Sequence, residues 1–167
     1  MSWRLPPLRR TVCIIGDSNL RSFSSSSKDD LQIECFPGMR LASLHKVLTH
    51  FVSPLSGPFP KAVIFSVGVN DRQYAKSTTK VNLDKVMSAA QKAFPKSQIY
   101  FSALNNYNVS SFEQANLRHF NKILQDKYQK RELTPIPDQQ FKTKPDGIHW
   151  TPDTAKHILE HWLQQVN

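Results

Sequence analysis

Cysteine is scarce in this chain: its 167 residues include two, Cys13 and Cys35. Both lie in apolar, strand-like runs, so we expect reduced core thiols and not a disulfide scaffold. No apolar run approaches the roughly 20 residues that a membrane-spanning helix needs. The first ten residues include basic ones but lack the apolar region and cleavage site of a secretory signal. These absences favour a cytoplasmic protein, or an excised domain of one.

Acidic residues are outnumbered by basic ones, 13 against 22, which gives a formal net charge of +9. This excess suits an acidic partner, either nucleic acid such as RNA or an anionic membrane surface or phospholipid. The basic residues are scattered, and their small clusters are not interleaved with aromatic residues as in nucleic-acid-binding motifs. The alternative is a basic surface that serves solubility alone. The oligomeric state is not indicated.

Apolar periodicity predicts an α/β fold. We expect strands at 11–16, 31–36, 62–67 and 99–104, with a weaker fifth at 133–136 because of Pro135. We expect helices at 41–52, along the apolar stripe of 83–94, at 112–130 and at 152–166. A capping box of Ser111 and Gln114 opens the third of these, and Thr151 caps the last. The polar stretch 22–30 is expected to be a loop or a frayed helix end.

Strands that alternate with helices predict a parallel sheet covered by helices on both faces. One composition regime and no internal repeat indicate a single domain at 11–167, preceded by a basic arm or linker at 1–10. In such sheets, ligands bind beyond the carboxyl ends of the strands. Three short polar motifs follow three predicted strands, and we therefore expect them at one edge of the sheet.

The first motif is Gly16-Asp17-Ser18-Asn19, directly after the first strand. A Ser at this position lies near a helix N-terminus, whose free N–H groups favour developing negative charge. That placement suits a nucleophile. The alternative is a plain helix N-cap, in which Asp17 or Ser18 satisfies free N–H groups.

The other two motifs are Pro37-Gly38 after the second strand and Asn70-Asp71 after the third, and a loop containing Asp146 and His149 precedes the last helix. A Ser hydroxyl needs a base, for which His149 is the candidate, and Asp146 can orient that imidazole. The N–H groups of Ser18 and Gly38 and the Asn70 amide can stabilise an oxyanion. Taken singly, Asn70-Asp71 and Asp146-Gly147 are also ordinary turns, and His149 an ordinary surface residue.

Together these four blocks resemble the SGNH hydrolases, also called the GDSL esterase/lipase family, whose named residues match Ser18, Gly38, Asn70 and His149. The resemblance covers residues 12–150. It implies a flavodoxin-like three-layer α/β/α sandwich with a central five-stranded sheet. It also implies hydrolysis of carboxylic esters through a Ser-His-Asp triad, with no metal or other cofactor. The chain lacks the Gly-x-Ser-x-Gly elbow of ordinary α/β-hydrolases.

A narrower resemblance rests on Gly-Asp-Ser-Asn-Leu-Arg at 16–21, Asp-Gly-Ile-His-Trp at 146–150, the small size and the basic charge. In these features the chain looks like the esterase domain in the first open-reading-frame protein of some vertebrate LINE retrotransposons. Such proteins carry coiled-coil or nucleic-acid-binding segments outside this domain. The resemblance implies an excised module of a ribonucleoprotein component.

Some other residues allow two interpretations. His157-x-x-Glu160-His161 matches a zinc pattern, but six residues follow it and none is a metal ligand, so a polar helix face is expected. Trp150 is either a packing residue or a pocket wall. An acyl pocket, or else core and scattered surface positions, is expected for Phe23, Met39, Tyr74 and Tyr107.

Two functions from different classes therefore remain after the sequence analysis. One is a serine esterase acting on short-chain acyl or acetyl esters, or on lipids. The other is a lipid- or RNA-binding module on an esterase scaffold. A pure binding module needs no base with its orienting carboxylate, which favours the enzyme.

Overall fold

Five parallel strands form one sheet in the order β2-β1-β3-β4-β5 in the computed structural model, which describes residues 3–23 and 30–166. The strand bounds are β1 Val12–Gly16, β2 Leu31–Cys35, β3 Ala62–Ser66, β4 Gln98–Ser102 and β5 Glu132–Leu133. The helix bounds are α1 Leu41–Thr49, α2 Lys76–Ala93, α3 Ser111–Lys127 and α4 Pro152–Val166. Within the described residues there are also four short 3₁₀ helices: η1 Ser18–Ser22, η2 Val69–Asp71, η3 Gln129–Arg131 and η4 Asp138–Gln140.

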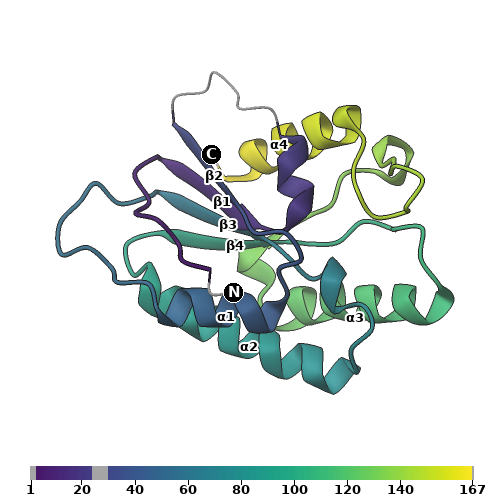
Figure 1. The fold of residues 1–167 in the computed structure, drawn as a ribbon, viewed down its shortest axis with the longest axis horizontal. Coiled ribbons are helices and arrows are strands. Elements are labelled where there is room, and N and C mark those ends of the chain that lie inside the picture. The colour runs from purple at the N-terminus through teal and green to yellow at the C-terminus, as the bar shows by residue number, and fades with distance from the viewer. Residues whose placement is uncertain (1–2, 24–29, 167) are drawn as a thin grey trace.

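The sheet lies between two layers of helices, as Figure 1 shows. The helices α1, α2 and α3 cover one face, while α4 and η1 lie on the other. For η1 on one side and α1, α2 and α3 on the other, this division follows from right-handed crossovers. The chain moves in one direction across the sheet from β2 to β5 and in the other from β1 to β2. The helix α4 follows the last strand and lies on the η1 side. The expected three-layer α/β/α sandwich is therefore confirmed.

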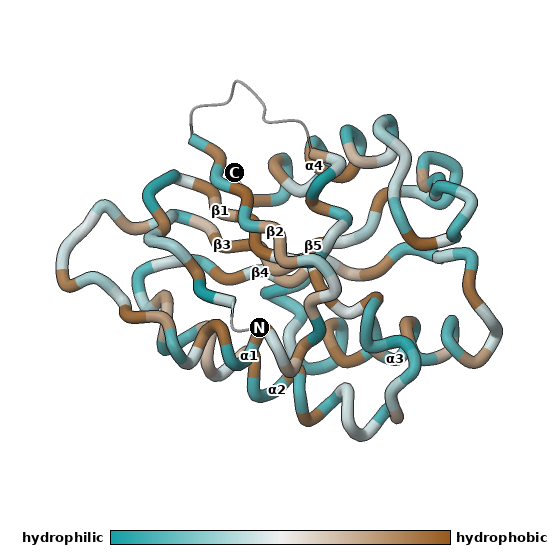
Figure 2. Tube along the Cα trace, viewed as in Figure 1, coloured by the Kyte–Doolittle hydropathy of each residue, from teal (hydrophilic) through white to brown (hydrophobic). Residues whose placement is uncertain are grey.

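The core lies along the central strands. Every residue of β1 and β3 is buried, as expected for strands covered on both faces. Figure 2 shows this as hydrophobic colour concentrated along the strands, with hydrophilic colour around the outside of the molecule. Cys13 is buried in the core on β1, as predicted, whereas Cys35 on β2 is only half-buried; both thiols are free.

Several predicted boundaries need correction. The helices predicted at 41–52 and 112–130 end earlier, at Thr49 and Lys127, and the strand predicted at 99–104 ends at Ser102. The capping box of α3 consists of Ser110 and Glu113, one residue earlier than the predicted pair of Ser111 and Gln114. The fifth strand is shorter than predicted and ends at Leu133, because Pro135 has no N–H and the Thr134 N–H donates to the Gln165 side chain instead. The second helix starts at Lys76, well before its apolar stripe. Its first turns are mostly polar, so the apolar pattern does not reveal where the helix begins.

The segment predicted to be a basic arm or linker lies partly within the described residues. Within its described residues, 3–10, Leu8 is buried in the core and the Trp3 ring packs on Phe36 at 5.6 Å. The Gln32 side chain also accepts from Arg9 N–H and donates to the Pro7 carbonyl. This part of the arm lies against the domain. The predicted serine-rich loop falls largely at 24–29, outside the described residues.

Candidate active site

The end of β1 presents Ser18 at the carboxyl edge of the sheet. Asp17 is the N-cap of η1: its side chain is buried and accepts the Asn19 N–H at 3.0 Å. Because Asp17 fills the capping role, the Ser18 hydroxyl is available for other contacts. The N-cap interpretation of this motif therefore applies to Asp17, and the nucleophile interpretation remains for Ser18.

Ser18, His149 and Asp146 form a chain of hydrogen bonds. The Ser18 Oγ lies 2.9 Å from His149 Nε2, and His149 Nδ1 lies 2.5 Å from Asp146 Oδ2. The second carboxylate oxygen, Oδ1, accepts the N–H groups of Ile148 and His149, each at 2.9 Å. The hydrogen bond with the His149 side chain, together with these backbone bonds, holds the pKa of Asp146 well below its usual value. Negative charge on Asp146 therefore orients His149, and Nε2 faces the hydroxyl.

The loop that carries His149 is held on both sides by Asn19. The Asn19 Nδ2 donates to the Ile148 carbonyl at 3.3 Å, and its Oδ1 accepts the Trp150 N–H at 3.0 Å. Asn19 is buried, so these bonds are shielded from water. The residue next to Ser18 therefore fixes the two residues on either side of His149.

A tight turn gives this loop its shape. Gly147 has a φ of 76°, and a Cβ there would lie 2.4 Å from the Asn108 carbonyl oxygen. The Asn108 N–H in turn donates to the Gly147 carbonyl at 3.2 Å. Only glycine fits this conformation and this close approach without strain. The turn thus packs the His149 loop against the segment that follows β4.

The aromatic residues beside the loop belong to the core. Trp150 is buried, donates from Nε1 to the Tyr107 hydroxyl at 3.0 Å, and packs on Phe23 at 5.6 Å. Phe23, Met39 and Tyr107 are all buried, whereas Tyr74 is half-buried. For the first three residues, the core interpretation therefore replaces the acyl pocket. Trp150 is a packing residue.

Gly38 and Asn70 lie at the same sheet edge as Ser18. The last residue of β1, Gly16, pairs with Cys35 of β2 and Ser66 of β3, so the chain leaves all three strands at one level. The Asn70 Nδ2 donates to the Met39 carbonyl at 3.1 Å, which ties the loop after β3 to the loop after β2. A primary amide nitrogen carries two hydrogens, so Asn70 can donate a second hydrogen bond.

Two buried carboxyl groups flank these donors. Burial raises the pKa of Asp17 to about 7 and that of Asp71 to about 6. The Asp71 Oδ2 accepts the Leu41 N–H at 3.1 Å, at the start of α1. Both groups lie directly beside predicted site residues, and both are set in place by backbone N–H groups.

Sequence reasoning did not assign roles to Asn19 or Asp71, although both lie within the motifs that it singled out. Their position beside Ser18 and Asn70 was the available signal. Their partners come from distant segments: Asn19 bonds to residues 129 and 131 positions away, and Asp71 to one 30 positions away.

Neither a metal cluster nor a membrane-spanning helix is found among residues 3–23 and 30–166. No group of three or more His, Cys, Asp or Glu side chains there could hold a metal ion. No helix there is both long and apolar enough to cross a membrane.

Comparison with known proteins shows the fold. No protein-family model matches the chain, and no curated protein is similar to it in sequence. Solved structures do match. A member of the lipolytic protein G-D-S-L family from Veillonella parvula superposes with a TM-score of 0.70 at 12% identity, over 92% of this chain and 96% of that one.

Two further structures give the same result. A carbohydrate esterase of family 3 from Talaromyces cellulolyticus matches with a TM-score of 0.70 at 13% identity, over 94% of this chain and 98% of that one. A GDSL-like lipase from Bacteroides thetaiotaomicron matches with a TM-score of 0.68 at 15% identity, over 92% and 85%. The chain therefore has the fold of these lipolytic and esterase structures along nearly its whole length.

Proposed function

We propose that this chain is a serine esterase of the SGNH hydrolase family that cleaves carboxylic esters with short acyl groups, such as acetyl. The observation that carries the proposal is the continuous hydrogen-bonded series from Ser18 Oγ through His149 to the Asp146 carboxylate. Such a series supplies a nucleophile, its base and the orienting group in the order that acyl transfer needs. The shared fold with esterase and lipase structures supports it.

Acylation begins when Ser18 Oγ attacks the ester carbonyl carbon and His149 Nε2 takes the hydroxyl proton. Asp146 stabilises the imidazolium that forms, because its carboxylate lies 2.5 Å from Nδ1. The new oxyanion accepts hydrogen bonds from the N–H groups of Ser18 and Gly38 and from the Asn70 amide. When the intermediate collapses, the bond to the leaving alkoxide breaks and His149 gives it the proton.

Deacylation repeats these steps with water. His149 takes a proton from the attacking water, whose oxygen bonds to the acyl carbon. Collapse then breaks the bond to Ser18 Oγ, which recovers the proton, and the carboxylic acid leaves. The side chains of His149 and Asp146 are 41% and 48% exposed, so water reaches this site readily.

The test is hydrolysis of p-nitrophenyl esters of increasing acyl length by the wild type and by Ser18→Ala. Wild type is expected to hydrolyse the acetyl ester without added metal, and Ser18→Ala to lose about 10³-fold or more in kcat with an unchanged unfolding temperature. Ser56→Ala, at an exposed serine, is the control and keeps wild-type activity. Equal activity in Ser18→Ala would refute the proposal.

A second candidate is a binding module for lipid or RNA, which the net charge of +9 favours. Binding driven by phosphate contacts weakens steeply with salt and does not depend on Ser18. Titration of RNA or anionic vesicles at several salt concentrations, with wild type and Ser18→Ala, tests this candidate. Salt-sensitive binding without hydrolysis would favour it over the esterase.

The biological context that we propose is a retrotransposon-encoded protein of the cytoplasm. The motifs at 16–21 and 146–150, together with the basic charge, support this. Genomic sequence around the coding region tests it: a neighbouring reverse-transcriptase reading frame is expected. An isolated gene with introns and no such frame would contradict it.

A further inference from the structure

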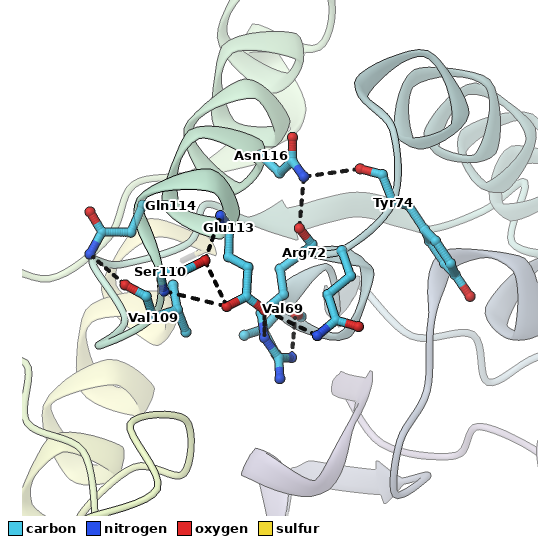
Figure 3. A network of polar contacts seen from close by, with 9 residues as sticks. Val69, Arg72, Tyr74, Val109, Ser110, Glu113, Gln114 and Asn116 are labelled. Carbon is cyan, nitrogen blue, oxygen red and sulfur yellow. Dashed lines mark hydrogen bonds and ion pairs between the residues drawn. The ribbon is translucent and has the colours of Figure 1, made fainter.

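The segment Val69–Tyr74 follows β3 and carries Asn70 into the candidate active site. It consists of η2 and the residues directly after it, and it lies between α3 and the loop that follows β2. Figure 3 shows its contacts with the start of α3. The side chains that make them lie outside the predicted triad and donor set.

Asn116 holds the backbone of this segment from α3. Its Nδ2 donates to the Arg72 carbonyl at 2.7 Å and to the Tyr74 carbonyl at 3.0 Å. Asn116 is 6% exposed, so both hydrogens of the amide are used in a place that water scarcely reaches. These bonds fix the backbone two and four residues after Asn70.

Glu113 lies three residues before Asn116 and therefore on the same face of α3. One carboxylate oxygen, Oε1, accepts from the Ser110 N–H and hydroxyl and caps the helix. The other, Oε2, pairs with Arg72 Nε at 3.0 Å and accepts from Gln73 Nε2 at 3.3 Å. One carboxylate thus joins the start of α3 to the segment after β3.

Arg72 connects Glu113 to the backbone next to Asn70. While its Nε pairs with Glu113, its Nη1 donates to the Val69 carbonyl at 3.0 Å. That carbonyl belongs to the peptide group that enters Asn70. On the opposite side, the Asn70 amide donates to the Met39 carbonyl. The backbone before Asn70 and its side chain are therefore both held, from two different neighbours.

We infer that Arg72, Glu113 and Asn116, here called the α3 clamp, are positioning residues that aim the Asn70 amide at the oxyanion. This inference rests on the proposed esterase function. Donors for an oxyanion act only when they are already in place where the charge develops, because reorganisation at the moment of reaction offsets their benefit. An error of about 1 Å in such a group can cost about 10²-fold in rate.

Glu113→Gln is the main test. Glutamine keeps an oxygen for the helix cap but loses the charge that orients Arg72. We expect kcat for p-nitrophenyl acetate to fall about tenfold while KM stays within about twofold, because the loss falls on the transition state. Rates are expressed per active site, counted by stoichiometric labelling of Ser18 with an organophosphate. Asp126→Asn removes an exposed ion pair from the same helix and serves as the control with unchanged kcat.

A double-mutant cycle separates positioning from a general structural role. If the α3 clamp acts through Asn70, then Glu113→Gln lowers kcat in the wild type but not in an Asn70→Ala background. If the two losses multiply, the clamp acts elsewhere and the inference is wrong. Arg72→Lys, which keeps the charge but not the guanidinium fork, gives the same comparison if Glu113→Gln does not fold.

The outcomes distinguish this inference from the proposed function. If the wild type hydrolyses the ester and Ser18→Ala does not, but Glu113→Gln has wild-type kcat, only the clamp is refuted. If the wild type has no activity, both the esterase and the clamp are refuted.

Discussion

Asn19 and Trp150 are joined by a buried hydrogen bond across 131 positions of the chain, from the Trp150 N–H to the Asn19 Oδ1 at 3.0 Å. The Asn19 Nδ2 bonds to the residue on the other side of His149. The turn after β1 and the loop before α4 are therefore held together by the residue that follows Ser18. The distance between the proposed nucleophile and its base depends on this side chain.

Replacing Asn19 is expected to affect both stability and activity. Asn19→Leu leaves a buried N–H and a carbonyl without partners, which costs about 1–3 kcal/mol of unfolding free energy. The released loop lowers kcat about tenfold or more, because His149 no longer stays within reach of Ser18. Urea unfolding and steady-state kinetics measure the two effects. Asn106→Leu, at an exposed amide, is the control; unchanged kcat in Asn19→Leu would show that the loop is held by other contacts.

Asp146→Asn tests the orientation of the imidazole. The asparagine oxygen can still accept the two backbone N–H groups, but the NH₂ that replaces Oδ2 donates toward His149 Nδ1. The proton of neutral His149 then moves to Nε2, which can no longer accept the Ser18 proton. In a Ser-His-Asp triad whose histidine is held in the wrong tautomer, kcat is strongly reduced. We therefore expect kcat of Asp146→Asn to fall roughly 10³- to 10⁴-fold.

The measurement for Asp146→Asn is kcat together with the unfolding temperature. Stability should change little, because the side chains of Asp146 and His149 are both exposed. The exposed Asp138 provides the matched control as Asp138→Asn. A loss of less than tenfold in Asp146→Asn would mean that Asp146 is not the orienting group.

The sheet could be predicted from the sequence because its signals are local. The run Val12–Ile15 is apolar throughout and Ala62–Val67 is apolar except for Ser66. This pattern is typical of a strand that is buried on both faces. The motif residues then fall at one edge because the strands are parallel. Ser18, Gly38 and Asn70 could be placed in this way, whereas the His149 loop precedes the last helix and was singled out by its Asp146 and His149 side chains.

The rest could not be predicted, for two physical reasons. Ser110-x-x-Glu113 and Ser111-x-x-Gln114 both fit a capping box, and only the extended backbone of Ser110, with φ −61° and ψ 160°, shows which one caps α3. The roles of Asn19 and Asn116 depend on backbone groups more than 40 positions away. Such partners are fixed only when the whole chain has folded.

The buried carboxyl of Asp17 predicts an unusual dependence of stability on pH. Burial raises its pKa from 3.8 to about 7. Between these values the folded state binds more protons than the unfolded state. The stabilising contribution of Asp17 is therefore complete below about pH 4 and is lost as the pH rises through about 7. Asp17→Asn removes this contribution and can still accept the Asn19 N–H.

The measurement is the unfolding free energy of wild type and Asp17→Asn between pH 4 and pH 8. We expect wild type to lose stability relative to the variant as the pH rises, with a slope of at most about 1.4 kcal/mol per pH unit. Asp71 titrates in both proteins and repels the Asp17 carboxylate, so the difference reports Asp17 together with this interaction. Asp126→Asn, at an exposed site, is the control. A flat difference for Asp17→Asn would contradict the raised pKa.

Gly38 and Gly147 both have positive φ, 78° and 76°, but differ in what surrounds them. An added Cβ at Gly147 would lie 2.4 Å from Asn108 O, whereas one at Gly38 meets nothing within 4 Å. Gly38→Ala therefore costs only the backbone strain, about 1–2 kcal/mol, and keeps its N–H. Gly147→Ala costs more and displaces the His149 loop.

If the Gly38 N–H faces the oxyanion, the new methyl of Gly38→Ala crowds the substrate, and kcat/KM falls about tenfold or more in a protein that remains folded. Thermal unfolding and ester hydrolysis of both variants check this, and wild-type kcat/KM in Gly38→Ala would place the oxyanion away from Gly38.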